Sequence, residues 1–297
     1  MASRIARMHR PVMKRVGREL AAATTPEAVR AVIDRANRLM APCRGVTIDP
    51  TTFGGLNGLR IVPKRDSDSG RHLLLFHGGG YVFGSPRMYQ ALAGRIAKAA
   101  GATVHIPDYR LAPEHPHPAA IEDGLAAYRS LLARTPADRL VVGGDSAGGN
   151  LTVAVLQAAG EEELPMPAGA VLLSPWLDLR GAAADKLNAS TEILILPEIV
   201  DRASGWYRGD HAADDPTISP LLGPLEGLPP TLVQVSDSEI LYTDSQDFVA
   251  TARAAGVDVT LEVEDDMWHV WQLMAPAVGE ARRSLASIGR FIVERTT

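Results

Sequence analysis

Short apolar runs alternate with longer helical segments along most of this 297-residue chain, and this alternation limits the fold more than any other feature. Each run has about four residues, and Gly, Pro or Asp flanks it. Such runs are typical of strands buried on both faces, as in a parallel sheet. The predicted strands are Leu73–Phe76, Thr103–Ile106, Leu140–Val142, Ala170–Leu173, Thr231–Val235 and Val259–Val263.

Helical segments lie between these strands. The strand–helix–strand order implies right-handed crossovers and predicts an α/β domain with a mostly parallel central sheet flanked by helices. Two further runs, Val46–Pro50 and Leu59–Pro63, are interpreted as an antiparallel hairpin at one edge. The predicted helices are Arg87–Ala100, Ala119–Arg134, Ala147–Ala159, Asp244–Ala255 and Gly279–Arg295.

Two segments do not follow the alternation, namely residues 1–45 and residues 180–225 or so. An insertion between two strands of an α/β sheet lies at the strand ends, where ligands bind. We therefore interpret both segments as a small helical cap. Residues 1–45 form an N-terminal cap segment, and the main domain of residues 46–297 carries a cap insertion at about 180–225.

The N-terminal segment has apolar residues at helical spacing with basic residues between them. This pattern predicts a surface helix whose apolar stripe covers another part of the protein. A helix that lies on a membrane surface is the alternative. The stripe consists of Ile5, Met8, Val12, Val16 and Leu20.

Charge and cysteine content exclude several classes of protein. The 30 basic and 35 acidic residues give a net charge of −5, whereas a nucleic-acid surface needs a concentrated basic face. No apolar run approaches the roughly 18 residues of a membrane span, so stable membrane insertion is not expected. The basic N-terminus lacks the apolar block of a signal peptide. The single cysteine, Cys43, cannot form an internal disulfide, which favours a cytoplasmic protein.

The run Gly144-Asp145-Ser146-Ala147-Gly148 matches the pattern G-x-S-x-G between a predicted strand and a predicted helix. A sharp turn at this place crowds the backbone, so glycines at its two ends avoid clashes. The turn exposes the Ser146 hydroxyl and points a helix N-terminus toward it. We interpret Ser146 as a nucleophile. An ordinary glycine-rich turn is the alternative.

The run His77-Gly78-Gly79-Gly80 ends an earlier strand. Consecutive glycines let backbone N–H groups surround an oxygen atom, as in an oxyanion hole. A flexible turn and a phosphate-binding loop are alternatives, but the loop lacks the Gly-Lys-Ser/Thr ending of the latter. His77 is predicted to anchor the loop rather than act as a base.

A serine nucleophile needs a histidine base and an acid, and their order on such a sheet is serine, acid, histidine. Of the eight histidines, His269 alone follows the fifth predicted strand. The segment after that strand offers Asp237, Glu239 and Asp244. Asp244 is expected to open the following helix, and the residues themselves do not separate Asp237 from Glu239. His115 and His117 could pair on a metal, but no third ligand is evident, so no metal site is predicted.

Four stretches, in order over about residues 70–275, resemble the hormone-sensitive-lipase-like esterases of the α/β-hydrolase superfamily. The resemblance implies an α/β-hydrolase fold, a Ser-acid-His triad, a two-part cap, and oxyanion donors from Gly79, Gly80 and Ala147. It implies no metal and no cofactor. Many members have Asp-Pro-Leu where this chain has Glu239-Ile240-Leu241, and alignment on the leucine favours Glu239 over Asp237. The stretches are HGGGYVFG (77–84), DYRLAPE (108–114), GDSAGGN (144–150) and MWHV (267–270).

These observations predict a carboxylic-ester hydrolase that acts on short- to medium-chain acyl esters through an acyl-enzyme, with Ser146, Glu239 and His269 as its triad. An amide or peptide hydrolase on the same fold is the first alternative. A ligand-binding receptor without catalytic activity is the second alternative, but such a protein should lack at least one residue of the triad. The expected partner is a small-molecule ester, and a homodimer is allowed. The expected pocket residues are Tyr81, Trp176, Trp206 and Trp268.

Overall fold

A computed structural model describes residues 2–37, 42–64 and 69–296. Its centre is an eight-stranded sheet with strand order β1-β2-β4-β3-β5-β6-β7-β8. The two pairs at the β1 edge are antiparallel, and every other neighbouring pair is parallel. The strands are β1 (Val46–Phe53), β2 (Leu56–Pro63), β3 (His72–Phe76), β4 (Thr103–Pro107), β5 (Leu140–Asp145), β6 (Gly169–Leu173), β7 (Thr231–Ser236) and β8 (Val259–Glu264).

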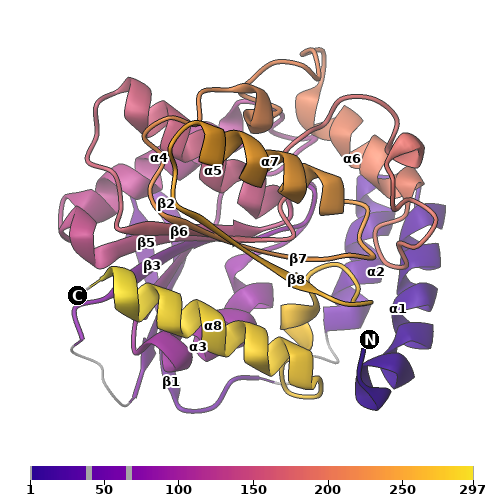
Figure 1. Cartoon of the computed structure of the whole chain (residues 1–297), viewed down its shortest axis with the longest axis horizontal. Coiled ribbons are helices and arrows are strands. Elements are labelled where there is room, and N and C mark those ends of the chain that lie inside the picture. The colour runs from indigo at the N-terminus through magenta and orange to yellow at the C-terminus, as the bar shows by residue number, and fades with distance from the viewer. Residues whose placement is uncertain (1, 38–41, 65–68, 297) are drawn as a thin grey trace.

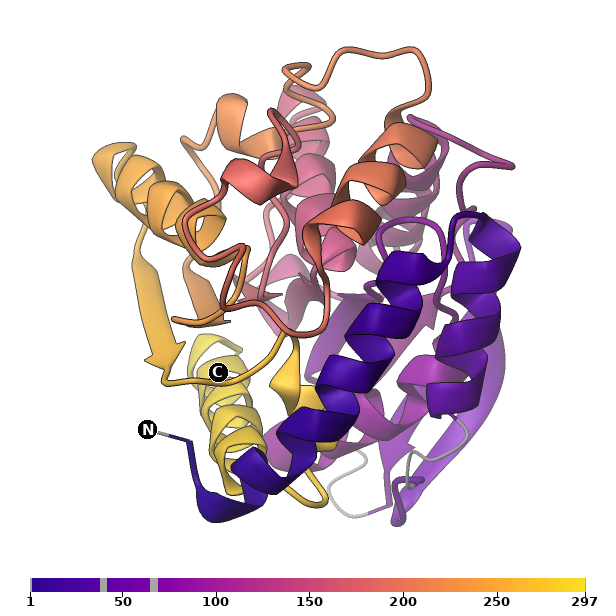
Figure 2. The same ribbon diagram turned by 90° about the vertical axis from the view of Figure 1, so that its right-hand side faces the viewer.

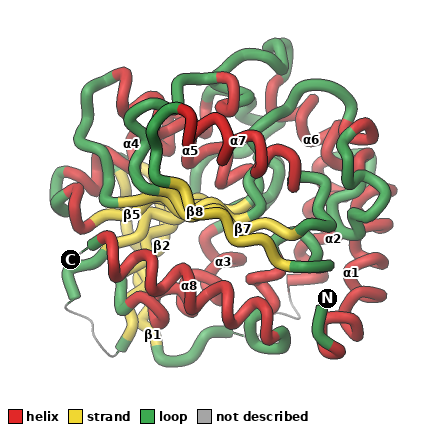
Figure 3. The backbone as a smooth tube through the Cα atoms, viewed as in Figure 1, coloured by secondary structure: helices red, strands yellow, loops and turns green. Residues whose placement is uncertain are grey.

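Helices cover both faces of this sheet, as Figures 1 and 3 show. Helices α3 and α8 lie on one face, and α4, α5 and α7 lie on the other. The remaining helices, α1, α2 and α6, lie beyond one end of the strands. The helices are α1 (Arg4–Ala22), α2 (Pro26–Asn37), α3 (Pro86–Ala100), α4 (Ala119–Leu132), α5 (Ala147–Glu161), α6 (Pro197–Arg208), α7 (Tyr242–Ala254) and α8 (Gly279–Arg295).

Burial on both faces explains why the central strands are apolar throughout. Alternate residues of a strand point to opposite faces. In β3, Leu73 and Leu75 pack in the core with α3 and α8, whereas Leu74 and Phe76 pack in the core with α4 and α5. The predicted mostly parallel α/β sheet, its edge hairpin and its flanking helices are therefore confirmed, with ends that differ by a few residues.

The N-terminal helices pack against the helix of the later insertion. Leu20 of α1, Val29 and Val32 of α2, and Ile199 of α6 share one buried cluster. Figure 2 shows α1 and α2 side by side with α6 beside them. This arrangement is a cap over the strand ends. The division into segments 1–45, 46–297 and 180–225 stays a prediction, and residues 38–41 lie outside the described part of the chain.

The apolar stripe predicted for α1 does not face the protein along its whole length. Ile5, Met8 and Val12 are 48%, 76% and 51% exposed, and the buried residues of the helix are Ala6, Gly17 and Leu20. The stripe packs against the protein at Val16 and Leu20, as predicted, and the prediction was wrong at Ile5, Met8 and Val12. The helix also approaches the insertion closely at Gly17. A Cβ atom at Gly17 would lie 2.2 Å from the Ile193 carbonyl oxygen, so this side packs against the insertion. Among the described residues, no helix is long and apolar enough to cross a bilayer.

Candidate active site

The turn between β5 and α5 holds Ser146 in a strained conformation, with φ 54° and ψ −121°. A side chain at either flanking glycine would clash, because a Cβ at Gly144 would lie 2.2 Å from the Gly148 carbonyl oxygen and one at Gly148 would lie 2.1 Å from that of Phe76. The predicted reason for both glycines is thus confirmed. Positive φ at a non-glycine residue costs about 1–3 kcal/mol, and residues strained in this way cluster at functional sites.

Two backbone hydrogen bonds hold this turn in place. The Ser146 N–H donates to the Leu173 carbonyl (2.9 Å), and the Trp176 N–H donates to the Ser146 carbonyl (3.1 Å). Both partners belong to β6 or its following loop. The neighbouring strand therefore fixes the serine at the N-terminus of α5, where the helix dipole favours negative charge.

The glycine loop after β3 lies beside this serine. Gly79 has φ 122°, and a Cβ there would lie 2.0 Å from the Phe83 carbonyl oxygen, so no other residue fits. Within the described part of the chain, the N–H groups of Gly79 and Gly80 donate no hydrogen bond to the protein. Ala147 is the first residue of α5, and its N–H has no partner within the helix. All three predicted donors remain available to a ligand.

Asp145 ties the glycine loop to the serine turn. Its Oδ1 accepts a hydrogen bond from the Gly78 N–H (3.0 Å), and its Oδ2 accepts one from the Tyr89 hydroxyl (2.7 Å). Burial raises the pKa of this carboxyl to about 6, although these two donors oppose the rise. Asp145 thus holds the loop against the turn that carries Ser146.

His77 is buried within the same loop and lies away from the pocket. Its ring stacks on Tyr109 with centroids 4.3 Å apart, and the Tyr109 hydroxyl donates to the His77 carbonyl (2.6 Å). Burial lowers the pKa of His77 to about 4, so the ring is uncharged at neutral pH. These contacts fit the anchoring role predicted for His77.

His269 contacts Glu239 and not Asp237. His269 Nδ1 lies 2.7 Å from Glu239 Oε2, and both side chains are buried. A carboxylate can only accept, so Nδ1 carries the proton and Nε2 has a free electron pair. Glu239 Oε1 accepts from the Ser174 hydroxyl and the Ser236 N–H, both at 2.8 Å. The acid is therefore held on both of its oxygens.

Asp237 lies at the surface of the same loop. Its Oδ1 accepts hydrogen bonds from the Asp266 N–H (2.8 Å) and the Ser238 hydroxyl (3.0 Å). The structure thus brings Glu239 to His269, whereas the Asp237 carboxylate accepts hydrogen bonds from neighbouring loop residues. The alternative acid that the residues left open does not reach the histidine.

The charged groups around His269 set its pKa. Burial alone lowers the pKa of the imidazole, but the hydrogen bond and charge of Glu239, with the charges of Glu192 and Asp145, outweigh burial and raise the pKa. The surroundings therefore favour the imidazolium that forms when the histidine accepts a proton.

An apolar pocket opens above Ser146 and His269. It has a volume of about 140 Å³. Asp145 and His269 are the only ionisable groups other than tyrosine among its lining residues in the described chain. Apolar side chains from three sources line the rest: Leu20 and Ile33 from α1 and α2; Leu194, Ile195, Ile199 and Val200 from the insertion; and Trp176, Leu241, Val270 and Leu273 from the main domain.

Of the four aromatic residues predicted for this pocket, Trp176 lines it and the others do not. Tyr81 is buried, stacks on Tyr207 at 3.7 Å, and donates its hydroxyl to Asn150 Oδ1 (2.7 Å). Trp268 is buried in the core beside α8, and Trp206 packs in the cluster between α1, α2 and α6. Aromatic residues carry much core packing. The closeness of these aromatic residues to the catalytic motifs in the sequence therefore did not show which of them line the pocket and which pack in the core.

A family model described as the alpha/beta hydrolase fold matches residues 73–273, which include the glycine loop, Ser146, Glu239 and His269. The chain belongs to this family. Among its relatives, an acetyl-hydrolase of Streptomyces hygroscopicus is 38% identical over 268 residues, which cover 90% of this chain and 89% of the relative. An esterase of Acinetobacter venetianus is 35% identical over 270 residues, covering 90% and 88%.

Solved structures relate the chain to a narrower group of hydrolases within this family. An esterase from the bacterial hormone-sensitive lipase family has a TM-score of 0.89 and 39% identity, covering 97% of this chain and 99% of that one. EstE7, described as a homologue of hormone-sensitive lipase, has a TM-score of 0.90 and 37% identity over the full length of both chains. The predicted resemblance to hormone-sensitive-lipase-like esterases is confirmed.

The sequence did not reveal that Glu192 of the insertion reaches the hydrolase's acid loop. This carboxylate is buried, and its Oε1 accepts hydrogen bonds from the N–H groups of Ile193 (2.8 Å), Leu194 (2.7 Å) and Ile195 (3.3 Å). Its Oε2 accepts one from the Ile240 N–H (3.1 Å), next to Glu239. Glu192 therefore joins the cap to the loop of the acid. A lone glutamate in an irregular segment has no sequence pattern that would indicate this contact.

Proposed function

We propose that this hydrolase cleaves carboxylic esters, with Ser146 as nucleophile, His269 as base and Glu239 as the acid. The observation that carries the proposal is the contact between His269 Nδ1 and Glu239 Oε2, in a pocket that also contains the strained Ser146 turn. A histidine fixed in this tautomer can take a proton at Nε2. The names of the relatives, acetyl-hydrolase and esterase, agree with the proposal.

The proposed reaction has two halves. Ser146 Oγ attacks the ester carbonyl carbon while His269 Nε2 takes the hydroxyl proton, and the N–H groups of Gly79, Gly80 and Ala147 hold the oxyanion. The tetrahedral intermediate collapses as His269 protonates the leaving alcohol, which leaves an acyl-enzyme on Ser146. Water then attacks the acyl-enzyme with His269 as base, and the acid product leaves. No step needs a metal or a cofactor.

The pocket favours a small apolar ester. Its lining is mostly aliphatic, so an acyl chain gains from burial, and no lysine or arginine lines it within the described residues. A peptide substrate would need groups that hold an amine or a carboxylate. We therefore propose short- to medium-chain acyl esters as substrates and keep amide hydrolysis as the alternative. A cytoplasmic location and a homodimer stay predictions.

A panel of p-nitrophenyl esters from acetate to palmitate tests this function, with the matching anilides as amide substrates. We expect the highest kcat/KM for short or medium acyl chains and at least 10-fold lower values for anilides, because amines are poorer leaving groups. Equal or faster anilide cleavage would support the amide alternative. Ester turnover that Ser146→Ala leaves intact would contradict the proposed site.

A further inference from the structure

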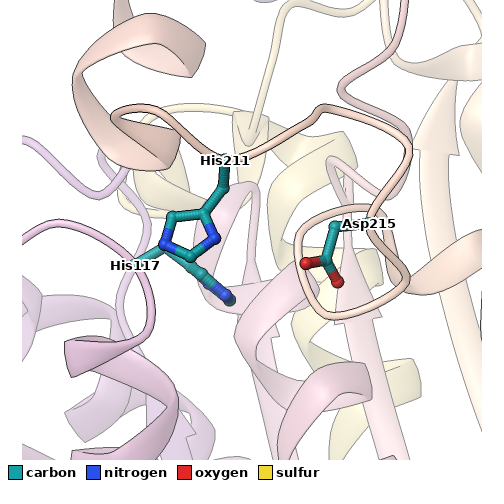
Figure 4. A group of neighbouring side chains, drawn as sticks. All are labelled: His117, His211 and Asp215. Atoms are coloured by element: carbon teal, nitrogen blue, oxygen red, sulfur yellow. The ribbon is translucent and has the colours of Figure 1, made fainter.

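Three side chains with metal-binding atoms meet outside the ester pocket. His117 lies in the loop before α4, and His211 and Asp215 lie in the loop after α6 (Figure 4). The sequence alone predicts no metal site, because no third ligand for His115 and His117 is evident in it. The structure brings two partners to His117 that lie more than 90 positions along the chain. None of the three lines the ester pocket.

The spacing of these groups is close to that of a metal site. Their ligand atoms all lie within 4.8 Å of one another. A tetrahedral Zn²⁺ ion, with metal–ligand distances of about 2.1 Å, holds its ligand atoms roughly 3.4 Å apart. The groups must therefore approach by at most about 1.4 Å. His211 is exposed and its ring makes no hydrogen bond to the described residues, so its side chain can turn inward.

Neighbouring groups already hold the other two side chains. The Thr217 hydroxyl donates to Asp215 Oδ1 (2.6 Å) and lies 3.0 Å from His117 Nε2. The Tyr207 hydroxyl lies 3.4 Å from His117 Nδ1. Whichever nitrogen of His117 binds a metal, the other keeps a polar neighbour. Such outer contacts orient ligands in known metal sites.

The protonation states agree with metal binding. Burial and the nearby His211 lower the pKa of His117, although Asp215 opposes them, so the ring is uncharged at neutral pH. Hydrogen bonds from Thr217 lower the pKa of Asp215 and keep it ionised. Neutral imidazole and ionised carboxylate are the forms that bind a metal.

We propose that His117, His211 and Asp215 bind one divalent ion of the zinc class, which fastens the cap to the main domain. Two imidazoles and one carboxylate suit Zn²⁺, whereas Mg²⁺ prefers oxygen ligands alone. The ion would join the loop before α4 to the loop after α6. The loop before α4 already meets the last turn of α6, where the His117 N–H donates to the Tyr207 carbonyl (2.8 Å). Tyr207 in turn stacks on Tyr81, directly after the oxyanion glycines.

The bound ion should stabilise the fold, because it binds the native arrangement and not the unfolded chain. The test uses the full chain without a polyhistidine tag, treated with EDTA and then desalted. Titration with ZnCl₂, followed by calorimetry and thermal unfolding, should show one site. At a hundredfold excess over Kd we expect a rise in Tm of about 5 °C, and we expect no rise with MgCl₂.

Three variants assign the ion to this cluster. His211→Ala should abolish binding and the Tm rise, and Thr217→Val should weaken binding about 10- to 100-fold because it removes an outer contact. His115→Ala is the matched control, since His115 is an exposed neighbour outside the cluster, and it should bind as the unaltered protein does. The proposal is refuted if Zn²⁺ neither binds nor raises Tm. It is equally refuted if His211→Ala and His115→Ala bind alike, which would place the ion elsewhere, for example at His72 and His105, whose nitrogens lie 3.0 Å apart.

Discussion

Replacement of Glu239 by glutamine should inactivate the enzyme because it changes the tautomer of His269. Glu239 Oε1 accepts two hydrogen bonds, from the Ser174 hydroxyl and the Ser236 N–H. The single oxygen of the new amide must stay with these two donors, so its NH₂ group takes the place of Oε2. That NH₂ group then donates to His269 Nδ1, which moves the ring proton to Nε2. A histidine protonated at Nε2 cannot accept the serine proton.

The expected loss is large. The corresponding Asp→Asn change in a serine protease triad lowers kcat by about 10⁴, which is roughly 5 kcal/mol of barrier. Asp237→Asn is the matched control, because it lies two residues away and its carbonyl oxygen can still accept from the Asp266 N–H. We expect the control to lose less than about tenfold, or ~1.4 kcal/mol.

The assay compares both variants on p-nitrophenyl butyrate across pH, after matched thermal unfolding shows that each is folded. A Glu239→Gln variant within tenfold of the unaltered enzyme would refute the tautomer argument. A dead Asp237→Asn variant beside an active Glu239→Gln variant would make Asp237 the acid, against the contact seen in the structure.

Two further substitutions and one pH profile test the rest of the site. Ser146→Ala should lower kcat by about 10⁶ with an unchanged fold, and circular dichroism with a stopped assay checks both. The pKa of His269 is raised above 6.5, so the acid limb of kcat/KM should lie above pH 6.5, and a limb below that value would contradict the charge argument. Glu192→Gln removes a negative charge that raises this pKa, so the limb should move to lower pH, whereas a role limited to cap packing would leave the limb in place.

The sequence could predict those parts of the site in which packing allows few kinds of residue. The glycines at 144 and 148 admit no side chain, so the motif itself reports the turn and Ser146. The central strands were predictable for a similar reason, because burial on both faces allows few polar residues. The acid was harder to predict. Asp237 and Glu239 lie on one loop, and only the packing of that loop against Ser174 shows which carboxylate turns inward.

Contacts between distant segments could not be predicted from one sequence. Glu192 meets Ile240 across 48 positions, and His117 meets His211 and Asp215 across more than 90 positions. These residues belong to irregular segments, where no periodicity fixes their neighbours. Helix α1 shows the same limit, since its hydrophobic spacing does not reveal that Leu20 is buried whereas Ile5, Met8 and Val12 are exposed.

Three buried carboxylates surround the one histidine of this site, and their arrangement accounts for its charge preference. Glu239 touches the ring, while Glu192 and Asp145 act through their charge. Burial raises the pKa values of Glu192 and Asp145, so their charged forms are held at a cost. When His269 accepts the serine proton, its positive charge offsets all three at once. The charges are in place before the reaction begins, so they favour the transition state without rearrangement. Glu192 belongs to the cap and Asp145 to the serine turn, so the cap contributes to the electrostatics of the triad.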